Sequence, residues 1–286
     1  MRRLAACAVF ALLFLFTIPA LTQDKLTAED VVKKHLDSIG TPEARSAAKV
    51  RAASGKFTMD VIQGGVGTAN GDAGIISAGK MLKILMRTDS PRYAGEKFWY
   101  DGKHVVVPVT DVASRTYLAD FIYRNEALLR DGIFSGAIGN SWALLDIKGR
   151  GAKLIYKGLK DVDGQNLHEI DYVPKKSASE LEIQMYFDPQ TFRHMMTRYK
   201  FQVTGYMNVT PGIDRQARTQ NSTNTTYRIE EKFSDFQTSD GVTLPRTWEI
   251  QYSVEPVRAI MMHWKADFTR VTPNPNIDLG SVFPEQ

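Results

Sequence analysis

Residues of the types that perform acid–base or metal chemistry form no convincing catalytic pattern in this chain of 286 residues. No two of its histidines have the spacing of metal ligands on one helix or strand, and the metalloprotease pattern HExxH is absent. Each histidine is therefore expected to be hydrogen-bonded in the core or exposed, and no metal site is predicted. The histidines are His35, His104, His168, His194 and His263.

Carboxylates and glycine-rich stretches give no better catalytic pattern. Glu230, Glu231 and Asp235 have the residue types for acid–base catalysis. A solvated strand face explains them more simply, because Lys232 stands among them as an ion-pair partner. The stretch after Gly65 lacks the spacing and the following helix of a dinucleotide-binding loop, and neither a P-loop nor a GxSxG elbow occurs. The sequence thus predicts no catalytic residue, no cofactor and no enzymatic activity.

Large apolar side chains are the more informative set. Tryptophans and methionines indicate an adaptable apolar interior, because methionine is flexible and fills irregular spaces. Two interpretations stay open: an ordinary packed core, or a concave pocket that holds a hydrophobic ligand under a helix. The candidate lining residues of such a pocket are Leu118, Phe121, Ile122, Leu128, Leu129, Trp142, Met185, Phe187, Trp248 and Trp264.

The stretch from Arg115 to Asp146 is the longest helix signal in a chain that otherwise favours strands. Its apolar residues recur at helical spacing from an N-cap at Thr116 to a stop at Gly132, although Asn125 interrupts the stripe. A short apolar segment, Trp142 to Leu145, follows. An apolar helix among strands must cover either a packed core or a cavity. If the cavity holds a ligand, the helix would have to move for that ligand to be released. The expected hinge points are Gly132, Gly136 and Gly139.

Alternation of apolar and polar residues predicts strands over most of the remaining chain. Asp-Gly pairs at 101–102, 163–164 and 240–241 indicate hairpin turns. The stretches 64–74 and 208–224 are interpreted as loops, and Thr27 to Gly40 as an amphipathic helix followed by a short helical turn at 42–48. The expected strands are 56–63, 80–87, 97–100, 104–109, 153–158, 166–173, 181–188, 192–203, 225–236, 242–252 and 260–271.

These roughly ten strands, joined mostly as sequential hairpins, predict an α+β fold that is mainly β. The implied architecture is a single wide antiparallel sheet, and a sheet of this width must curl into a half-barrel. The helix between the two runs of strands is suited to covering the concave face. No Pro/Ser-rich linker separates two cores, so residues 24–286 are expected to form one domain.

The first 23 residues have the composition of a secretory signal peptide. Arg2 and Arg3 precede an apolar run from Leu4 to Ile18, which is short for a membrane span. A retained membrane anchor is the alternative. Cys7 is the sole cysteine, so the chain after residue 23 has no disulfide, which suits the bacterial periplasm.

Charge argues against a nucleic-acid partner. Without the two leading arginines, 34 of the 36 Lys and Arg residues remain against 32 Asp and Glu residues. No basic run with interleaved aromatic residues occurs.

Several motifs together resemble a known family. The segments AEDVVKKHLDSIG, KVRAASGKF, FWYDGK, LLRDGIFSGAIGNSWALLD, LIYKGLKDVDGQNLHEI, LEIQMYFDPQTFRHMMTRY, EEKFSDFQTSDGVTLPRTWEI and NPNIDLGSVF are similar to the LolA/LolB-type superfamily, in its outer-membrane lipoprotein-sorting-protein-like branch. The resemblance spans nearly the whole chain after the signal segment. It implies a curved half-barrel closed by helices, with a hydrophobic cavity for the acyl chains of lipoproteins. No individual gating residue of the carriers is matched, and the 208–224 loop makes this chain longer than the compact carriers.

The first hypothesis for function is a periplasmic, non-enzymatic carrier or binder of lipids or lipidated proteins. The alternative is an envelope sensor or scaffold with a filled core that acts through protein–protein contacts. An enzyme is a third reading, which requires titratable groups on the concave face. The expected partners are a lipid or lipidated protein and an envelope membrane protein, and the protein is expected to be a monomer.

Overall fold

The computed structural model describes residues 26–109, 115–176, 181–203, 225–255 and 259–284. Its strands are β1 (Val50–Gln63), β2 (Thr68–Ala78), β3 (Met81–Thr88), β4 (Gly95–Tyr100), β5 (Val105–Val106), β6 (Lys153–Val162), β7 (Gln165–Val173), β8 (Glu182–Phe187), β9 (His194–Val203), β10 (Thr225–Ser239), β11 (Val242–Glu255) and β12 (Ile260–Pro273). Its helical segments are α1 (Ala28–Ile39), α2 (Pro42–Ala47), α3 (Tyr117–Arg124), α4 (Ala127–Arg130), η1 (Gly136–Ile138), η2 (Ala143–Asp146), α5 (Ile147–Arg150) and α6 (Leu279–Val282).

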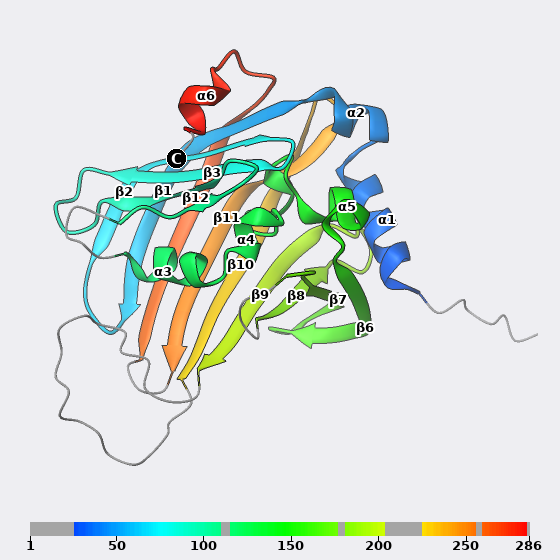
Figure 1. Ribbon diagram of the computed structural model, residues 1–286. Coiled ribbons are helices and arrows are strands. Elements are labelled where there is room, and N and C mark those ends of the chain that lie inside the picture. Colours follow the sequence, from blue (N-terminus) through cyan, green and yellow to red (C-terminus); the bar gives the residue numbers. More distant parts are fainter. Residues whose placement is uncertain (1–25, 110–114, 177–180, 204–224, 256–258, 285–286) are drawn as a thin grey trace, which may run out of the picture.

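The strands form one curved sheet in the order β5-β4-β3-β2-β1-β12-β11-β10-β9-β8-β7-β6 (Figure 1). Every neighbouring pair is antiparallel, and the pairing of β1 with β12 joins the two ends of the chain. Because β5 and β6 are opposite edges, the segment between them must cross the whole sheet. It does so on the concave side, where α3, α4 and α5 lie (Figure 1). The predicted half-barrel with helices on its concave face is confirmed.

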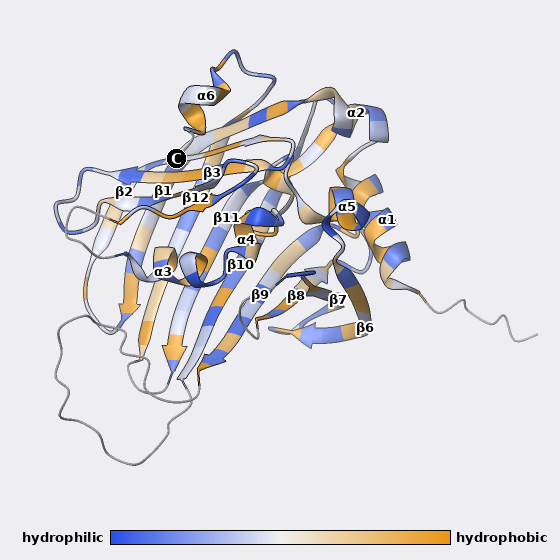
Figure 2. Ribbon diagram, viewed as in Figure 1, coloured by the Kyte–Doolittle hydropathy of each residue, from blue (hydrophilic) through white to orange (hydrophobic). Residues whose placement is uncertain are grey.

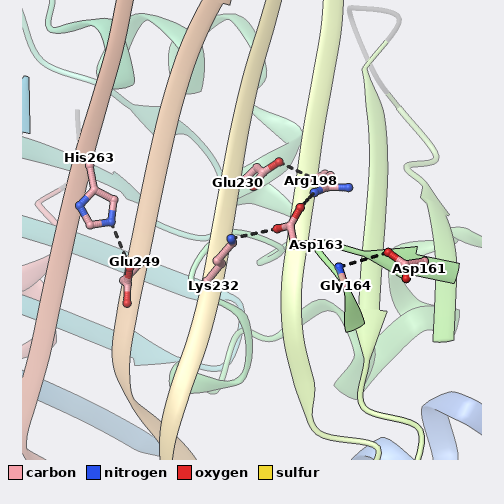
Figure 3. A network of polar contacts seen from close by, with 8 residues as sticks. All are labelled: Asp161, Asp163, Gly164, Arg198, Glu230, Lys232, Glu249 and His263. Atoms are coloured by element: carbon pink, nitrogen blue, oxygen red, sulfur yellow. Dashed lines mark hydrogen bonds and ion pairs between the residues drawn. The ribbon is translucent and has the colours of Figure 1, made fainter. Parts of the chain in front are cut away.

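Alternation along the strands separates the two faces of the sheet (Figure 2). On the inner face, the buried Ile250 of β11 lies opposite the buried Trp264 of β12. The outer face carries polar networks (Figure 3). There Asp163 accepts from both Arg198 and Lys232, at 3.3 and 3.1 Å.

Helix α1 begins with the predicted capping box. Thr27 Oγ1 accepts from the Asp30 amide at 3.2 Å, and the Asp30 carboxylate accepts from the Thr27 amide at 3.0 Å. Its buried face, which includes Val31 and Ile39, joins the core of the sheet. At 12 residues it is longer than any other helix among the described residues. None of these helices is long and apolar enough to span a bilayer.

Three structural expectations are wrong in detail. The sheet has 12 strands rather than about ten, because much of the expected loop 64–74 belongs to β2. There Gly71 packs so close to the Arg87 carbonyl and the Phe57 ring that a side chain would collide with them. The strand expected at 104–109 is only the two residues of β5. The predicted signal peptide, residues 1–23, and the loop 208–224 lie outside the described residues.

The single helix expected from Thr116 to Gly132 is also wrong, because it consists of α3 and α4. Asn125 breaks it with φ −125° and ψ 55°. The Asn125 side chain donates to the Phe121 carbonyl at 2.8 Å and so satisfies a carbonyl group of the first helix. The polar residue that interrupts the apolar stripe is therefore the point where the helix ends.

Candidate functional site

The cover, defined as residues 115–150, brings six of the ten predicted lining residues against four from the strands. All ten belong to one buried cluster, and none is more than 2% exposed. The cover contributes Leu118, Phe121, Ile122, Leu128, Leu129 and Trp142, and the sheet contributes Met185, Phe187, Trp248 and Trp264. These side chains fill the space between the cover and the sheet. Their role in binding a ligand stays a prediction.

Apolar and aromatic contacts hold α3 on the sheet. The ring centre of Phe121 lies 5.2 Å from that of Phe201 and 6.4 Å from that of Tyr252. Tyr117 stacks on the same Tyr252 at 5.8 Å. Burial of apolar surface is non-directional, so other apolar groups are able to replace these side chains.

A buried carboxyl group, Glu96 of β4, fixes the start of α3. Thr116 Oγ1 donates to Glu96 at 2.6 Å and accepts from the Ala119 amide at 3.0 Å, which confirms the predicted N-cap. The Tyr93 hydroxyl donates to Glu96 at 2.8 Å and accepts from Trp264 Nε1 at 2.7 Å. Burial raises the pKa of Glu96 to about 7, although both hydroxyl donors act in the opposite direction.

A second buried carboxyl group, Glu231 of β10, holds the cover beyond α4. Its Oε1 atom accepts from the Ser135 amide at 2.8 Å and from Trp248 Nε1 at 2.7 Å. Its Oε2 atom accepts from the Tyr199 hydroxyl. Burial raises the pKa of Glu231 to about 8, and the three donors oppose that shift.

The prediction that Glu231 lies on a solvated strand face is wrong, whereas Glu230 and Lys232 do have contacts on the outer face (Figure 3). Successive strand residues point to opposite faces, and Glu231 has the same parity as the buried Ile229 and Phe233. This alternation is the sequence signal that identifies Glu231 as an inward-facing residue.

Polar contacts hold residues 135–142, which we call the anchor. Arg51 donates to two carbonyl groups of η1, at 3.3 and 3.4 Å. The Asn140 amide donates to Ser77 Oγ at 2.7 Å, and Trp142 Nε1 donates to His35 Nε2 at 3.0 Å. The cover thus has two parts: the anchor, fixed by directional hydrogen bonds, and the lid, α3 and α4. Apolar contacts hold the lid, together with polar attachments at its two ends, Thr116 to Glu96 and Arg130 to the Lys176 carbonyl group.

Two buried polar atoms lack a hydrogen-bond partner among the described residues: Ser135 Oγ in the anchor and His194 Nδ1 beside it. Ser135 also has a left-handed φ of 74°. Burial lowers the pKa of His194 well below its ordinary value, and that of His35 to about 4. His194 still meets the expectation of a hydrogen-bonded core histidine, because its Nε2 atom lies 2.8 Å from Thr197 Oγ1, and only its second ring nitrogen lacks a partner. Strain and missing partners coincide here, as they do at functional sites.

Two hollows lie away from the ten predicted lining residues. One is a narrow hollow between α1, η1 and the β10–β11 hairpin, and it is bordered by His35 and His194. The other is polar, lies across β8, β9 and β10, and is bordered by Arg198, Lys200 and Arg228. None of the ten lining residues borders either hollow, and all ten side chains are buried.

Gly132 closes the turn between lid and anchor, and its replacement gives a testable prediction. Its φ is 65°, and a Cβ atom would collide with the Ser141 carbonyl oxygen. We expect Gly132→Ala to lower the free energy of unfolding by about 3 kcal/mol or more, because strain and overlap add. Gly79→Ala is the matched control, since its φ is 56° and nothing lies within 4 Å. Urea unfolding measures both, and equal losses would contradict the tight turn.

Comparison with known proteins gives structural similarities at low sequence identity. No family model matches the chain, and no curated protein matches it by sequence. A LolA superfamily protein from Nitrosomonas europaea is 11% identical with a TM-score of 0.47, over 91% of this chain and 99% of that one. An outer membrane lipoprotein-sorting protein domain from Vibrio parahaemolyticus is 12% identical with a TM-score of 0.44, over 90% and 97%.

A third solved structure, a DUF1329 family protein from Desulfovibrio piger, is 9% identical with a TM-score of 0.41, over 89% of this chain and 96% of that one. A solved structure of the LolA superfamily is thus among those that this chain resembles, and its sequence motifs resemble the same superfamily. At these TM-scores, no ligand and no activity is transferred from those proteins to this chain.

Proposed function

We propose that the protein is a periplasmic, non-enzymatic carrier or binder of acyl chains, which belong to a lipid or to a lipidated protein. The acyl chain enters between the lid and the concave face of the sheet. Phe121, Leu118 and Ile122 of α3 leave that face, and the ligand takes their place. Transfer in this form makes and breaks no covalent bond.

One observation carries this proposal: the lid and the anchor are attached to the sheet by different kinds of contact. The anchor has hydrogen bonds from Arg51, Asn140 and Trp142, which a displaced segment would lose. The body of α3 contacts the sheet through apolar and aromatic side chains, and its polar attachment is at its start, Thr116 to Glu96. An apolar ligand is therefore able to replace the apolar contacts that the lid loses when it moves. It would not replace the hydrogen bonds that the anchor would lose.

The free energies of this exchange are of similar size. Burying a large apolar side chain contributes about 1.5–3 kcal/mol, and each CH₂ group of an acyl chain contributes about 0.8 kcal/mol. A long acyl chain therefore offers on the order of 10 kcal/mol, which is comparable with what several lid side chains lose when they move into water. Because the two free energies are of similar size, the net free energy of exchange is small, and the ligand is able both to bind and to leave.

The proposal predicts acyl chains in the native protein. We expect native mass spectrometry of protein purified from a bacterial periplasm to show a mass increment that is lost after lipid extraction. We expect the extracted protein to increase the fluorescence of a pyrene-labelled fatty acid. The matched control is the same protein in urea, in which the sheet is unfolded. A protein that is reproducibly empty and ignores the probe would contradict the proposal.

A filled concave face also favours the second candidate, an envelope sensor or scaffold that works through its outer surface. All ten predicted lining residues are buried in this structure, as that candidate requires. An empty protein that ignores the acyl probe but binds an envelope protein would support it. The fluorescence assay therefore separates the two candidates.

A further inference from the structure

The two edges of the sheet differ in length and in what lies against them. The β5 edge is two residues long, and its Val106 packs with Trp99 and with Phe283, which follows α6. The opposite edge, β6, is ten residues long and pairs on one side with β7. No strand among the described residues pairs with its other side, as Figure 1 shows at the rim of the sheet. A free edge presents a row of backbone N–H and C=O groups.

The side chains of β6 combine apolar and positive groups. Ile155 and Leu159 are 36% and 54% exposed, and Lys153, Lys157 and Lys160 are exposed around them. Lysine on an edge strand commonly prevents aggregation, but a strand that only repels partners has no need of exposed apolar side chains.

Positive charge continues beyond the first residue of β6. Lys153 lies opposite Val173, so Lys175 and Lys176 follow close to the start of β6, and Lys148 precedes it on α5. Among the described residues, Lys157 pairs with Asp171 at 3.5 Å, whereas none of the following has an ion pair: Lys148, Lys153, Lys160, Lys175 and Lys176. Asp161, at the far end of the strand, accepts a hydrogen bond from the Gly164 amide at 3.1 Å.

We propose that β6 is the docking site for an acidic, extended segment of a partner protein, which adds to the sheet as a further strand. Backbone hydrogen bonds supply the affinity. Alternate acidic side chains of the segment face Lys153 and Lys160, and the apolar side chains between them lie against Leu159, which the register shift between Tyr156 and Gly158 places on the opposite face from Ile155. This site is independent of acyl-chain binding, because it lies at the edge of the sheet and not on its concave face.

A second copy of this chain fits the edge poorly. Antiparallel pairing of two β6 strands would bring the lysines of both copies together, and like charges across strands are destabilising. An acidic segment meets the same lysines as counterions.

The test uses a fluorescent peptide of about eight residues that alternates aspartate and valine, a length typical of strands. We expect it to bind the full chain and to protect the amides of β6 from hydrogen exchange. N-methylation of alternate backbone amides should weaken binding at least tenfold, because it removes hydrogen-bond donors and keeps the charge. Equal binding of the methylated peptide, or no binding by either one, would overturn the proposal.

Charge reversal on the protein provides the matched comparison. The double variant Lys153→Glu, Lys160→Glu should weaken peptide binding at least tenfold. The control variant Lys56→Glu, Lys265→Glu carries the same change on β1 and β12, in the middle of the sheet, and should bind normally. Equal weakening in both variants would overturn the proposal. So would binding of anionic phosphatidylglycerol vesicles that depends on Lys153 and Lys160 but leaves β6 unprotected, because it would identify a membrane contact.

Discussion

Replacement of Phe121 by aspartate is expected to abolish retention of the pyrene-labelled fatty acid while the sheet stays folded. Phe121 is 2% exposed and lies against Phe201 and Tyr252, with no cationic partner in those contacts. A carboxylate at that position would lose its hydration without gaining a partner, which costs several kcal/mol. Lifting α3 into water relieves this cost, because the lid has few polar contacts to lose.

The measurement combines far-UV circular dichroism, which reports the strands, with the rate at which the probe leaves the protein. Tyr123→Asp is the matched control, since it places the same charge on the same helix at a residue that is 47% exposed. We expect the control to retain the probe and to unfold within about 0.5 kcal/mol of the parent protein. If Phe121→Asp instead destroys the strand signal, then α3 is an integral part of the core and the carrier proposal loses its main support.

Local chemistry accounts for the parts of the fold that the sequence predicts well. The Asp-Gly pair at 163–164 has positive φ at both residues, and so does the pair at 240–241, as hairpin turns of this type require. The capping box at Thr27 forms because all its atoms lie within one helical turn. Turns and caps depend on neighbours in sequence, so a single chain is enough to predict them.

Features that depend on tertiary packing escaped prediction or were misplaced. Strand β2 has a glycine-rich sequence, and it is a strand because β1 and β3 pair with both of its sides. The helix break depends on one side chain, Asn125, which bonds to a carbonyl group four residues earlier. Glu231 has its inward orientation because its strand registers with β9 and β11. For β2 and Glu231 the deciding contact is made by another part of the fold, whereas the Asn125 contact lies within the helix itself.

The candidate site shows the same division. Periodicity identified ten apolar residues that the fold does bring into one cluster. It gave no sign that the cover has an apolar lid and a polar anchor, because the anchor's partners Arg51, Ser77 and His35 come from distant stretches of the chain. Sequence patterns indicate which side chains face inward, whereas the attachment of the cover is set by tertiary contacts.

Replacement of Glu231 by glutamine is expected to remove a loss of stability that the parent protein suffers as the pH rises from 6.5 to 8. The pKa of Glu231 is raised from an ordinary value of 4.5 to about 8 in the folded protein, so the folded state keeps its proton where the unfolded state has released it. The free energy of unfolding therefore falls as the pH rises from 4.5 to 8, by on the order of 5 kcal/mol over that whole interval.

The interval from pH 6.5 to 8 is the most informative. Glu96, with its pKa near 7, acts in the same direction up to about pH 7. The buried His35 acts in the opposite direction: its pKa is lowered to about 4, so its contribution to stability is lost as the pH falls from 6.5 to about 4. Between pH 7 and 8, Glu96 completes its ionisation, and of these three groups Glu231 makes the larger remaining contribution to the slope.

Glutamine keeps the shape of the side chain, and its carbonyl oxygen is able to accept from the Ser135 amide and from Trp248 Nε1. The anchor should therefore stay in place. Urea unfolding at several pH values between 6.5 and 8 measures the slope, which we expect to be smaller in Glu231→Gln by about 1 kcal/mol for each pH unit. Glu230→Gln, on the outer face beside Arg198, removes the same charge and should leave the slope unchanged. Equal slopes in the parent protein and in Glu231→Gln would show that the buried carboxyl group does not hold its proton at neutral pH.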